Sequence, residues 1–445
     1  MALLTRKGPV SSLNQAPIPY ISLFSGAGGL DLGLEAAGFE TRVCVDIDPH
    51  SCRTLRLNRS VGRKTGLHHF LHNAVVLEAD IRKLTADKLR RASRIKGQIP
   101  LLVGGPPCQA FSVFGQRKGM EDPRGTLLHE YLRILRALNP KAFLFENVEG
   151  LLTVNGGRAY ANFLTALQNK GSTPSYKISA YVVEAANFGV PQFRQRVFIF
   201  GSLDGVVVPK PSATHYIDWA RLSPAAQTWN AIPQDLLKCP RVDEIFDGLP
   251  SPSYTSKLPN HVGRKHSLEI IERYRNLEFG ERDPLTRINK LHPERPSYTI
   301  IVGSDKGGGK GHVHPFEPRE VTPRESARAQ TFPDWWWFSG TSRHPIRQVG
   351  NAVPPLLGAA MGLHVKRHLF GIETKASHEE ILRNLGLSYL LKEPSKGPRW
   401  LGDLFVNLAR EQDGKSVSAL WRSVESKVPA SPNRQNTSVR RQVVG

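Results

Sequence analysis

The feature of this sequence that most constrains its fold is the alternation, over its first 205 residues, of short apolar runs with segments of helical spacing. The apolar runs are YISLF (20–24), TRVCVDID (41–48), AVVLEAD (74–80), IPLLVGG (99–105), AFLFENV (142–148) and RVFIFG (196–201). Short apolar runs bounded by turn residues are typical of buried strands. Because strands that alternate with helices pair in parallel, the pattern predicts a doubly wound, mostly parallel α/β sheet. Ligands of such sheets lie at the carboxyl ends of the strands.

The alternation stops at about residue 205, and a helical pattern returns in NAVPPLLGAAMGLHVKRHLF (351–370). Between these points Pro, Ser, His and charged residues dominate, and GSDKGGGKGHVHP (303–315) is typical of a loop. A chain of 445 residues also exceeds what one core usually holds. We therefore predict a first domain (1–205), an inserted domain (206–318), a return segment that completes the first domain (319–371), and a dispensable extension (372–445) with a disordered polar end.

Composition narrows the class of partner. The chain carries 60 Lys and Arg against 39 Asp and Glu, a net charge of +21, which favours a polyanion and above all nucleic acid. The basic stretch 82–96 is either part of that contact or a solvated helix face. The four cysteines form no CxxC pair and no metal-ligand spacing, so we expect neither a bound metal nor disulfides. With no apolar signal or membrane-length run, the expected location is the cytoplasm.

A glycine turn and two acids end successive predicted strands. FSGAGG (24–29) lies between the first strand and a helix, where glycines allow close backbone approach and a helix N-terminus faces a ligand. Asp46 ends the second strand, where an acid binds a ribose diol in such folds, and Asp80 ends the third. The chain has no GxxxxGK[ST] motif for a triphosphate. Although such a turn can simply cap a helix, the three features together predict an adenosine-bearing cofactor.

A cysteine, an acid and two arginines follow the later strands. Cys108 stands after two prolines in GGPPCQAFS, outside any predicted strand, which favours a nucleophile over a structural thiol. Glu146 ends an apolar strand, and partial desolvation there would favour its protonated form, although a solvated strand-end acid is the alternative. Arg194 and Arg196 alternate in PQFRQR, so they share one face if that segment is extended.

In their order along the chain, these motifs resemble those of the cytosine-5 DNA methyltransferases of the bacterial modification type. The motifs are FSGAGG, VDID, EADI, GGPPCQAFS, DPRGTLLHEYLRIL, ENV, PQFRQR, TPRESARAQTFPD and VGNAVPP, over roughly residues 20–371. The resemblance implies a Rossmann-like S-adenosylmethionine methyltransferase domain with a smaller inserted target-recognition domain. It also implies a monomeric enzyme acting on double-stranded DNA, without metal, associated with the nucleoid in a bacterium.

The resemblance also implies the roles of single residues. The S-adenosylmethionine site would comprise Phe24, Gly26, Gly28, Gly29, Asp46, Ile47, Asp80 and Asn351. Asp46 stands where the family usually has glutamate, so its carboxylate has a shorter reach. The catalytic residues would be Cys108, Glu146, Arg196 and Arg194. The Cys108 thiolate would add to C6 of a flipped-out cytosine, protonated Glu146 would bind N3 and the exocyclic amine, and Arg196 would hold O2.

Two other functions stay open at this level. A related RNA cytosine-5 methyltransferase would share the cofactor site, but the size of the insertion favours DNA. A non-catalytic DNA-binding relative would be expected to have lost the cysteine or the acid, and both Cys108 and Glu146 are present. Within the insertion, 295–315 is the expected reader of the DNA site, with phosphate contact as the role of Lys306 and Lys310.

Overall fold

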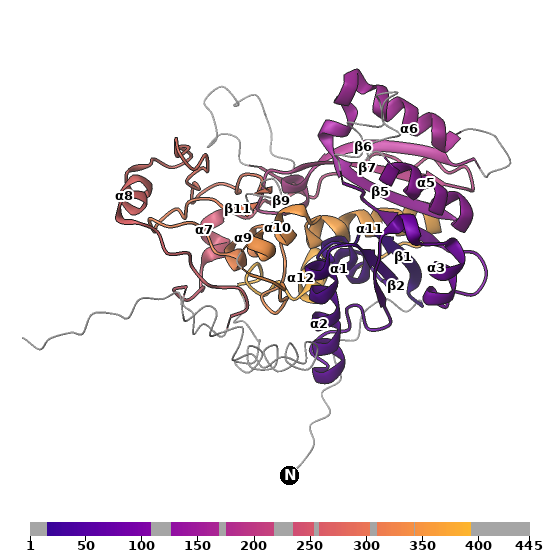
Figure 1. Ribbon diagram of the computed structural model, residues 1–445, viewed down its shortest axis with the longest axis horizontal. Coiled ribbons are helices and arrows are strands. Elements are labelled where there is room, and N and C mark those ends of the chain that lie inside the picture. Colours follow the sequence, from indigo (N-terminus) through magenta and orange to yellow (C-terminus); the bar gives the residue numbers. More distant parts are fainter. Residues whose placement is uncertain are drawn as a thin grey trace, which may run out of the picture.

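The computed structural model describes residues 16–107, 126–168, 175–217, 235–252, 258–302, 309–341 and 343–392 (Figure 1). In Figure 1, one side of the molecule holds a twisted sheet with its covering helices. The other side is a less regular lobe, with α8 at its far end. We call these the sheet lobe and the inserted lobe. None of the helices within the described ranges is long and apolar enough to cross a membrane.

Seven strands form the sheet in the order β3-β2-β1-β4-β5-β7-β6. Their bounds are Ile18–Leu23 (β1), Phe39–Asp46 (β2), Val75–Glu78 (β3), Leu101–Gly104 (β4), Ala142–Val148 (β5), Lys177–Glu184 (β6) and Gln195–Ser202 (β7). The first five strands pair in parallel, whereas β7 runs antiparallel between β5 and β6. The predicted mostly parallel α/β fold is therefore confirmed. The sequence analysis missed β6, an edge strand whose side chains are mostly only half-buried.

Alternate residues of the central strands pack on opposite faces of the sheet, as the twofold repeat of a strand requires. On β4, Leu101 and Val103 join the core on one face and Leu102 joins the core on the other. The helices beside the sheet are Gly29–Ala36 (α1), Pro49–Thr65 (α2), Ala86–Ser93 (α3), Thr126–Leu138 (α5), Arg158–Gln168 (α6) and Pro355–Phe370 (α11). Short 3₁₀ turns occur at Ile81–Lys83, Glu149–Leu152, Val154–Gly157 and Ala185–Phe188. Because both faces are covered, the strands are buried apolar runs.

Two late segments of the chain belong to the core of the sheet lobe. Helix α11 contacts α1 so closely that a Cβ on Gly33 would lie 2.3 Å from the carbonyl oxygen of Pro355. Beyond it, α12 (His378–Leu385) and the residues that follow bury Leu385 and Leu387 completely. The hydroxyl of Tyr389 donates to the carbonyl of Phe332 at 3.1 Å. The chain up to about residue 391 is therefore part of the folded core, which contradicts the expectation that the whole extension 372–445 is dispensable. The predicted disordered end lies outside the described residues.

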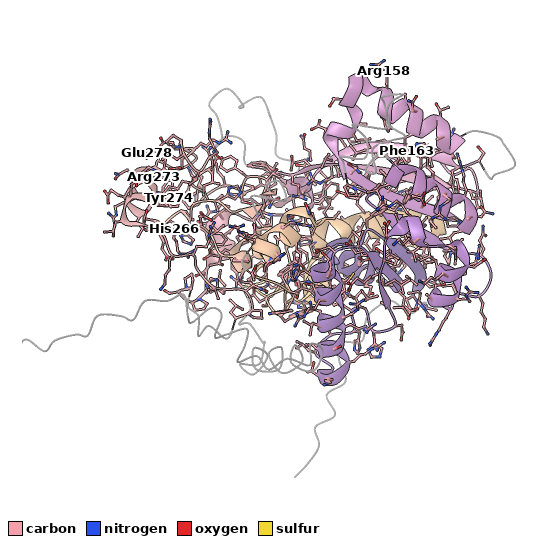
Figure 2. The ribbon with its side chains drawn as sticks, in the orientation of Figure 1. Arg158, Phe163, His266, Arg273, Tyr274 and Glu278 are labelled. Carbon is pink, nitrogen blue, oxygen red and sulfur yellow. The ribbon has the colours of Figure 1, made fainter. Side chains whose placement is uncertain are left out.

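The inserted lobe has little regular structure. Its elements are His215–Tyr216 (β8), Leu237–Lys238 (β9), Val242–Phe246 (α7), Leu268–Asn276 (α8), Ile301–Val302 (β10) and Gly309–Lys310 (β11). A small cluster of Tyr274, Leu277, Ile288 and Val313 forms its own core. Figure 2 shows Tyr274 at the far end of this lobe, away from Phe163 of the sheet lobe. In contrast, α7 packs into the main core through Ile245, so part of the predicted insertion shares the core of the sheet lobe. The predicted domain boundary at residue 206 stays a prediction.

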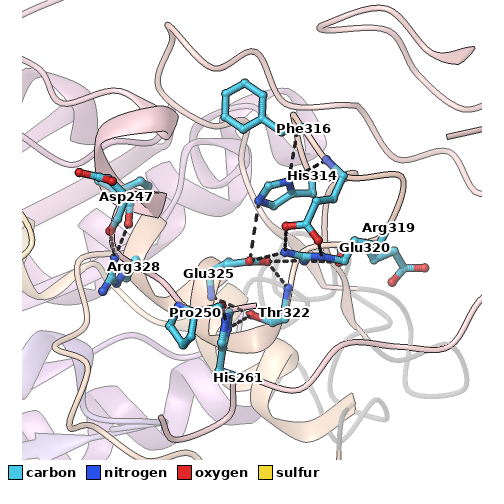
Figure 3. Close-up of polar contacts among 12 residues, drawn as sticks. Asp247, Pro250, His261, His314, Phe316, Arg319, Glu320, Thr322, Glu325 and Arg328 are labelled. Atoms are coloured by element: carbon cyan, nitrogen blue, oxygen red, sulfur yellow. Dashed lines mark hydrogen bonds and ion pairs between the residues drawn. The ribbon is translucent and has the colours of Figure 1, made fainter. Parts of the chain in front are cut away.

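A buried polar network joins the inserted lobe to the return segment (Figure 3). Thr322 and Glu325 cap α9 (Pro323–Ala329) reciprocally, and Arg319 pairs with Glu325 at 2.7 Å. His261 reaches the hydroxyl of Thr322 at 3.0 Å. A cavity of about 990 Å³ adjoins this network, and Phe246 and Glu325 are among its lining residues. None of the predicted site residues that the structure describes lines this cavity; they lie at the strand ends instead.

Candidate active site

The glycine turn after β1 is held by the acid at the end of β2. One carboxylate oxygen of Asp46 accepts the backbone N–H of Gly26 at 2.7 Å, and the other accepts that of Asp48 at 2.8 Å. Burial raises the pKa of Asp46 from its ordinary value. Each carboxylate oxygen can accept more than one hydrogen bond, so Asp46 keeps capacity for a ligand beside its structural task.

The three glycines of the turn have different reasons to be glycine. A Cβ on Gly28 would lie 2.6 Å from Leu55, and one on Gly29 would lie 2.2 Å from the carbonyl oxygen of Val353, so both allow close packing. Gly26 also has a positive φ of 53°, but a Cβ there would meet nothing within 4 Å. Phe24 precedes the turn with a φ of 56° and packs against the core. Gly26 is therefore the glycine that faces open space.

The other predicted cofactor residues lie on neighbouring loops. Ile47 is 63% exposed directly after Asp46, which is unusual for a large apolar side chain. Asp80 binds Arg82 at 2.6 Å, and this arginine lowers the pKa of Asp80. Because β2 and β3 are adjacent parallel strands, Asp46, Ile47 and Asp80 lie at the same edge of the sheet. Asn351 is the exposed last residue of α10 (Arg343–Asn351), two residues before the carbonyl that contacts Gly29.

An acid and an arginine meet at the ends of β5 and β7. The Nε of Arg196 lies 3.1 Å from a carboxylate oxygen of Glu146, and both side chains are only slightly exposed, at 11% and 13%. Burial raises the pKa of Glu146, while the charges of Arg196 and then Arg194 oppose that rise. The structure thus brings Glu146 and Arg196 together, as the sequence analysis anticipated.

Cys108 lies outside the described residues, but the chain that leads to it is fixed against Glu146. A Cβ on Gly105 would lie 2.8 Å from a carboxylate oxygen of Glu146. The side-chain amide of Asn147 donates to the carbonyl of Pro106 at 2.8 Å. Asn147 is buried, and the sequence analysis did not single it out although it stands in the ENV motif. The end of β4 and the end of β5 are therefore bound together two residues before the cysteine.

The other three cysteines are buried thiols. Burial raises the pKa of Cys52 to about 12 and also raises the pKa values of Cys44 and Cys239. Since the thiolate is the reactive form, none of the three suits a nucleophile. Among the residues that the structure describes, no group of His, Cys, Asp and Glu could hold a metal ion.

The basic stretch 82–96 begins beside Asp80 with Arg82, but its later part, from the end of α3 onward, lies at the opposite end of the strands. Arg90 of α3 donates to the carbonyl of Leu138, at the end of α5, and to that of Gly97, which precedes β4. These positions mark the amino ends of the parallel strands, away from Glu146. For this later part, the placement favours the interpretation as a solvated helix face.

Taken together, the strand order and the strand-end site are those of an α/β methyltransferase. Residues 18–367 match the family described as C-5 cytosine-specific DNA methylase, and the chain belongs to this family. It is a DNA cytosine-5 methyltransferase, of the kind found in Type II restriction-modification systems. The alternatives of an RNA methyltransferase and a non-catalytic relative are therefore set aside.

Named relatives agree with this membership. The chain is 32% identical over 378 residues to the Type II methyltransferase M.XorII of Xanthomonas oryzae pv. oryzae, covering 78% of this chain and 84% of that protein. It is 35% identical over 361 residues to M.NgoFVII of Neisseria gonorrhoeae, covering 78% and 85%.

Solved structures share the fold. A putative DNA modification methyltransferase encoded within an Escherichia coli prophage is 25% identical with a TM-score of 0.60, covering 79% of this chain and 99% of that one. The Schizosaccharomyces pombe Dnmt2 methyltransferase is 19% identical with a TM-score of 0.52, covering 78% and 98%, which is a likeness of fold alone.

Proposed function

We propose that this enzyme takes its methyl group from S-adenosylmethionine and places it on C5 of a cytosine flipped out of a specific duplex DNA site. The observation that carries the proposal is the 3.1 Å contact of Arg196 with the carboxyl group of Glu146, slightly exposed at the strand ends beside the chain that leads to Cys108. Flipping the base out of the stack costs a few kcal/mol of unstacking free energy, which contacts between the base and the protein would offset.

The residues at the ends of β2 and β3 fit the cofactor. Exposed Ile47 offers an apolar surface for a flat purine, and the carboxylates of Asp46 and Asp80 are acceptors for a ribose diol and an exocyclic amine. Gly26 leaves the adjoining space open. Phe24, Gly28 and Gly29 shape the turn, and Asn351 adjoins it through the return segment. Bound there, S-adenosylmethionine would supply an electrophilic methyl group.

C5 of cytosine is a weak nucleophile, and side chains of the protein increase its reactivity. The Cys108 thiolate adds to C6, forming a C6–S bond and an enamine whose electron density is raised at C5. Protonated Glu146 donates to N3 and so draws charge from the ring, and burial favours that protonated form. Arg196 lies beside Glu146 and can donate to O2. After methylation the C5 proton leaves to water and the C6–S bond breaks, which restores the thiolate.

The finer features of the partner remain proposals. We assign reading of the DNA site to residues 206–318, and in particular to 295–315, the segment that contains β10 and β11. The loop 303–308, with Lys306, lies outside the described residues. A monomeric enzyme acting in the cytoplasm, at the nucleoid in a bacterium, remains our prediction.

A duplex with 5-fluorocytosine at the target tests the covalent step. Fluorine cannot leave as a cation, so elimination stops after methylation and the protein should stay bonded to DNA, only when S-adenosylmethionine is present. Peptide mass spectrometry should map the bond to Cys108. The Cys108→Ala protein should form no adduct, whereas the matched variant Cys239→Ala should form it normally. An adduct at another cysteine, or methylation by Cys108→Ala, would contradict the mechanism.

A further inference from the structure

Arg194 occupies a position that its neighbour Arg196 does not. Its side chain is only 1% exposed, so it has no surface with which to contact a substrate. Its Nη2 donates to the carbonyl of Gly350 at 2.8 Å and to the carbonyl of Ala352 at 2.9 Å. These two carbonyls flank Asn351. The guanidinium therefore reaches from the start of β7 into the turn between α10 and α11.

The backbone of Arg194 is anchored as firmly as its side chain. Its N–H donates to the carboxylate of Glu184, at the end of β6, at 2.6 Å, and its carbonyl accepts the N–H of Ala185 at 2.9 Å. Two residues further on, Arg196 pairs with Glu146. A shift of the turn that holds Arg194 would therefore also move Arg196 relative to Glu146.

The far end of the connection is equally rigid. The carbonyl of Val353 lies against Gly29 so closely that no Cβ would fit. The side-chain amide of Gln330 donates to the carbonyl of Val349 at 3.0 Å, one residue before the carbonyls that Arg194 holds. The segment 349–353 is thus held between the glycine turn and Arg194, with Asn351 at its centre.

The buried position of Arg194 lowers the stability of the fold. The Nε and Nη1 of Arg194 are buried without a hydrogen-bond partner, and burial depresses the pKa of its guanidinium. A buried cation with unsatisfied donor groups is unfavourable, and an apolar side chain of similar volume would often be tolerated as well or better. Features that break such a rule concentrate at functional sites, where position matters more than stability.

We infer that Arg194 is a positioning residue that couples the two halves of the active site, setting Asn351 on the cofactor side through the carbonyls of Gly350 and Ala352 while it anchors the approach to Arg196 on the base side. The inference rests on the proposed function, since the roles of Asn351 and Arg196 are themselves proposals. It gives Arg194 an indirect task in place of the direct contact that its place in the PQFRQR motif suggested.

A double-mutant cycle in cofactor affinity tests the coupling. The dissociation constant for S-adenosylmethionine, without DNA, is measured by calorimetry for the wild type, Arg194→Met, Asn351→Ala and the double variant. We expect each single change to weaken binding by about tenfold. The double variant should also bind about tenfold more weakly than the wild type, because both changes remove the same interaction. Arg194→Lys keeps the charge, and we expect it to recover part of the affinity.

Arg324 supplies the matched control. It is a fully buried arginine that donates to the carbonyls of Pro259, Pro333 and Trp336, so Arg324→Met removes the same kind of bonds outside the segment 349–353. That variant should lower the melting temperature but leave cofactor affinity unchanged. Should Arg194→Met not fold, the cycle is run with Arg194→Lys.

Two outcomes would overturn the inference: effects of Arg194 and Asn351 that simply multiply, or an equal loss of affinity in Arg324→Met. Either can occur while the wild type still forms the Cys108 adduct with fluorinated DNA, in which case the proposed function stands and only the coupling fails. Loss of the adduct in the wild type would instead reject the proposed function.

Discussion

The sheet lobe and the inserted lobe differ in the interactions that stabilise each of them internally. In the sheet lobe, strands such as β4 and β5 are buried apolar runs, and the acid Glu146 stands at the end of one of them. In the inserted lobe, buried Asp283 organises a turn by accepting bonds from Thr286 and from the guanidinium of Arg273. Apolar packing gives the chemistry a rigid frame, whereas local polar contacts let a recognition surface vary without disturbing that frame.

The largest expected effect tests where the sheet lobe ends. Truncation after Thr374 removes Ile381, Leu385 and Leu387 from the main core, and single buried leucines are each worth about 2 to 5 kcal/mol. We expect this protein to be unfolded or insoluble, because the total approaches the whole stability of a domain. Truncation after Lys392 removes none of these residues and should retain the wild-type melting temperature and methylation. Equal melting temperatures for the two truncations would contradict this boundary.

The second prediction breaks the chemistry of the sheet lobe without touching its packing. Glu146→Gln keeps the shape of the side chain and a hydrogen-bond donor but has no acidic proton to share with N3, so the turnover rate should fall by about 10²- to 10⁴-fold. Single-turnover methylation with tritiated cofactor measures the rate, and the circular dichroism spectrum checks the fold. A variant with near wild-type turnover would mean that Glu146 only anchors Arg196.

The third prediction separates packing from ligand contact within the glycine turn. Gly29→Ala forces a Cβ against the carbonyl of Val353 and should cost about 1 to 3 kcal/mol of unfolding free energy. Gly26→Ala meets no atom and should cost only the strain of a left-handed residue, about 1 to 2 kcal/mol. We expect Gly26→Ala to weaken cofactor binding more than its stability loss would suggest. Chemical denaturation and calorimetry, run on both variants, decide between the two roles.

The smallest effect concerns acid sensitivity of the inserted lobe. The hydrogen bonds of Arg273 and Thr286 hold the pKa of Asp283 at about 2, despite the opposing effect of burial. Because the folded pKa lies below the unfolded one, this stabilisation is complete above about pH 4 and is lost as the pH falls through about 2. Asp283→Asn should therefore loosen this lobe at neutral pH and flatten its acid transition. Hydrogen exchange of residues 268–288 should report the change, with the strands of the sheet lobe as the internal reference.

Much of the sheet lobe could be predicted from the sequence because its signals are local. The apolar runs predict β1 to β5 and β7, and the structure confirms these strands, since a buried strand needs an apolar sequence whatever surrounds it. β6 escaped because an edge strand carries a mixed pattern. Asn147 escaped because its value lies in a bond to Pro106, 41 positions earlier, which no local pattern encodes.

The sequence by itself determined the kind of fold and the kinds of chemical group at its strand ends, because both follow from residue types at short spacing. Only the tertiary structure decided which neighbouring arginine faces the acid. Arg194 and Arg196 are two positions apart, yet one is buried against the return segment and the other pairs with Glu146. It likewise decided that the segment up to residue 391 belongs to the core, because burial depends on partners that lie far away along the chain.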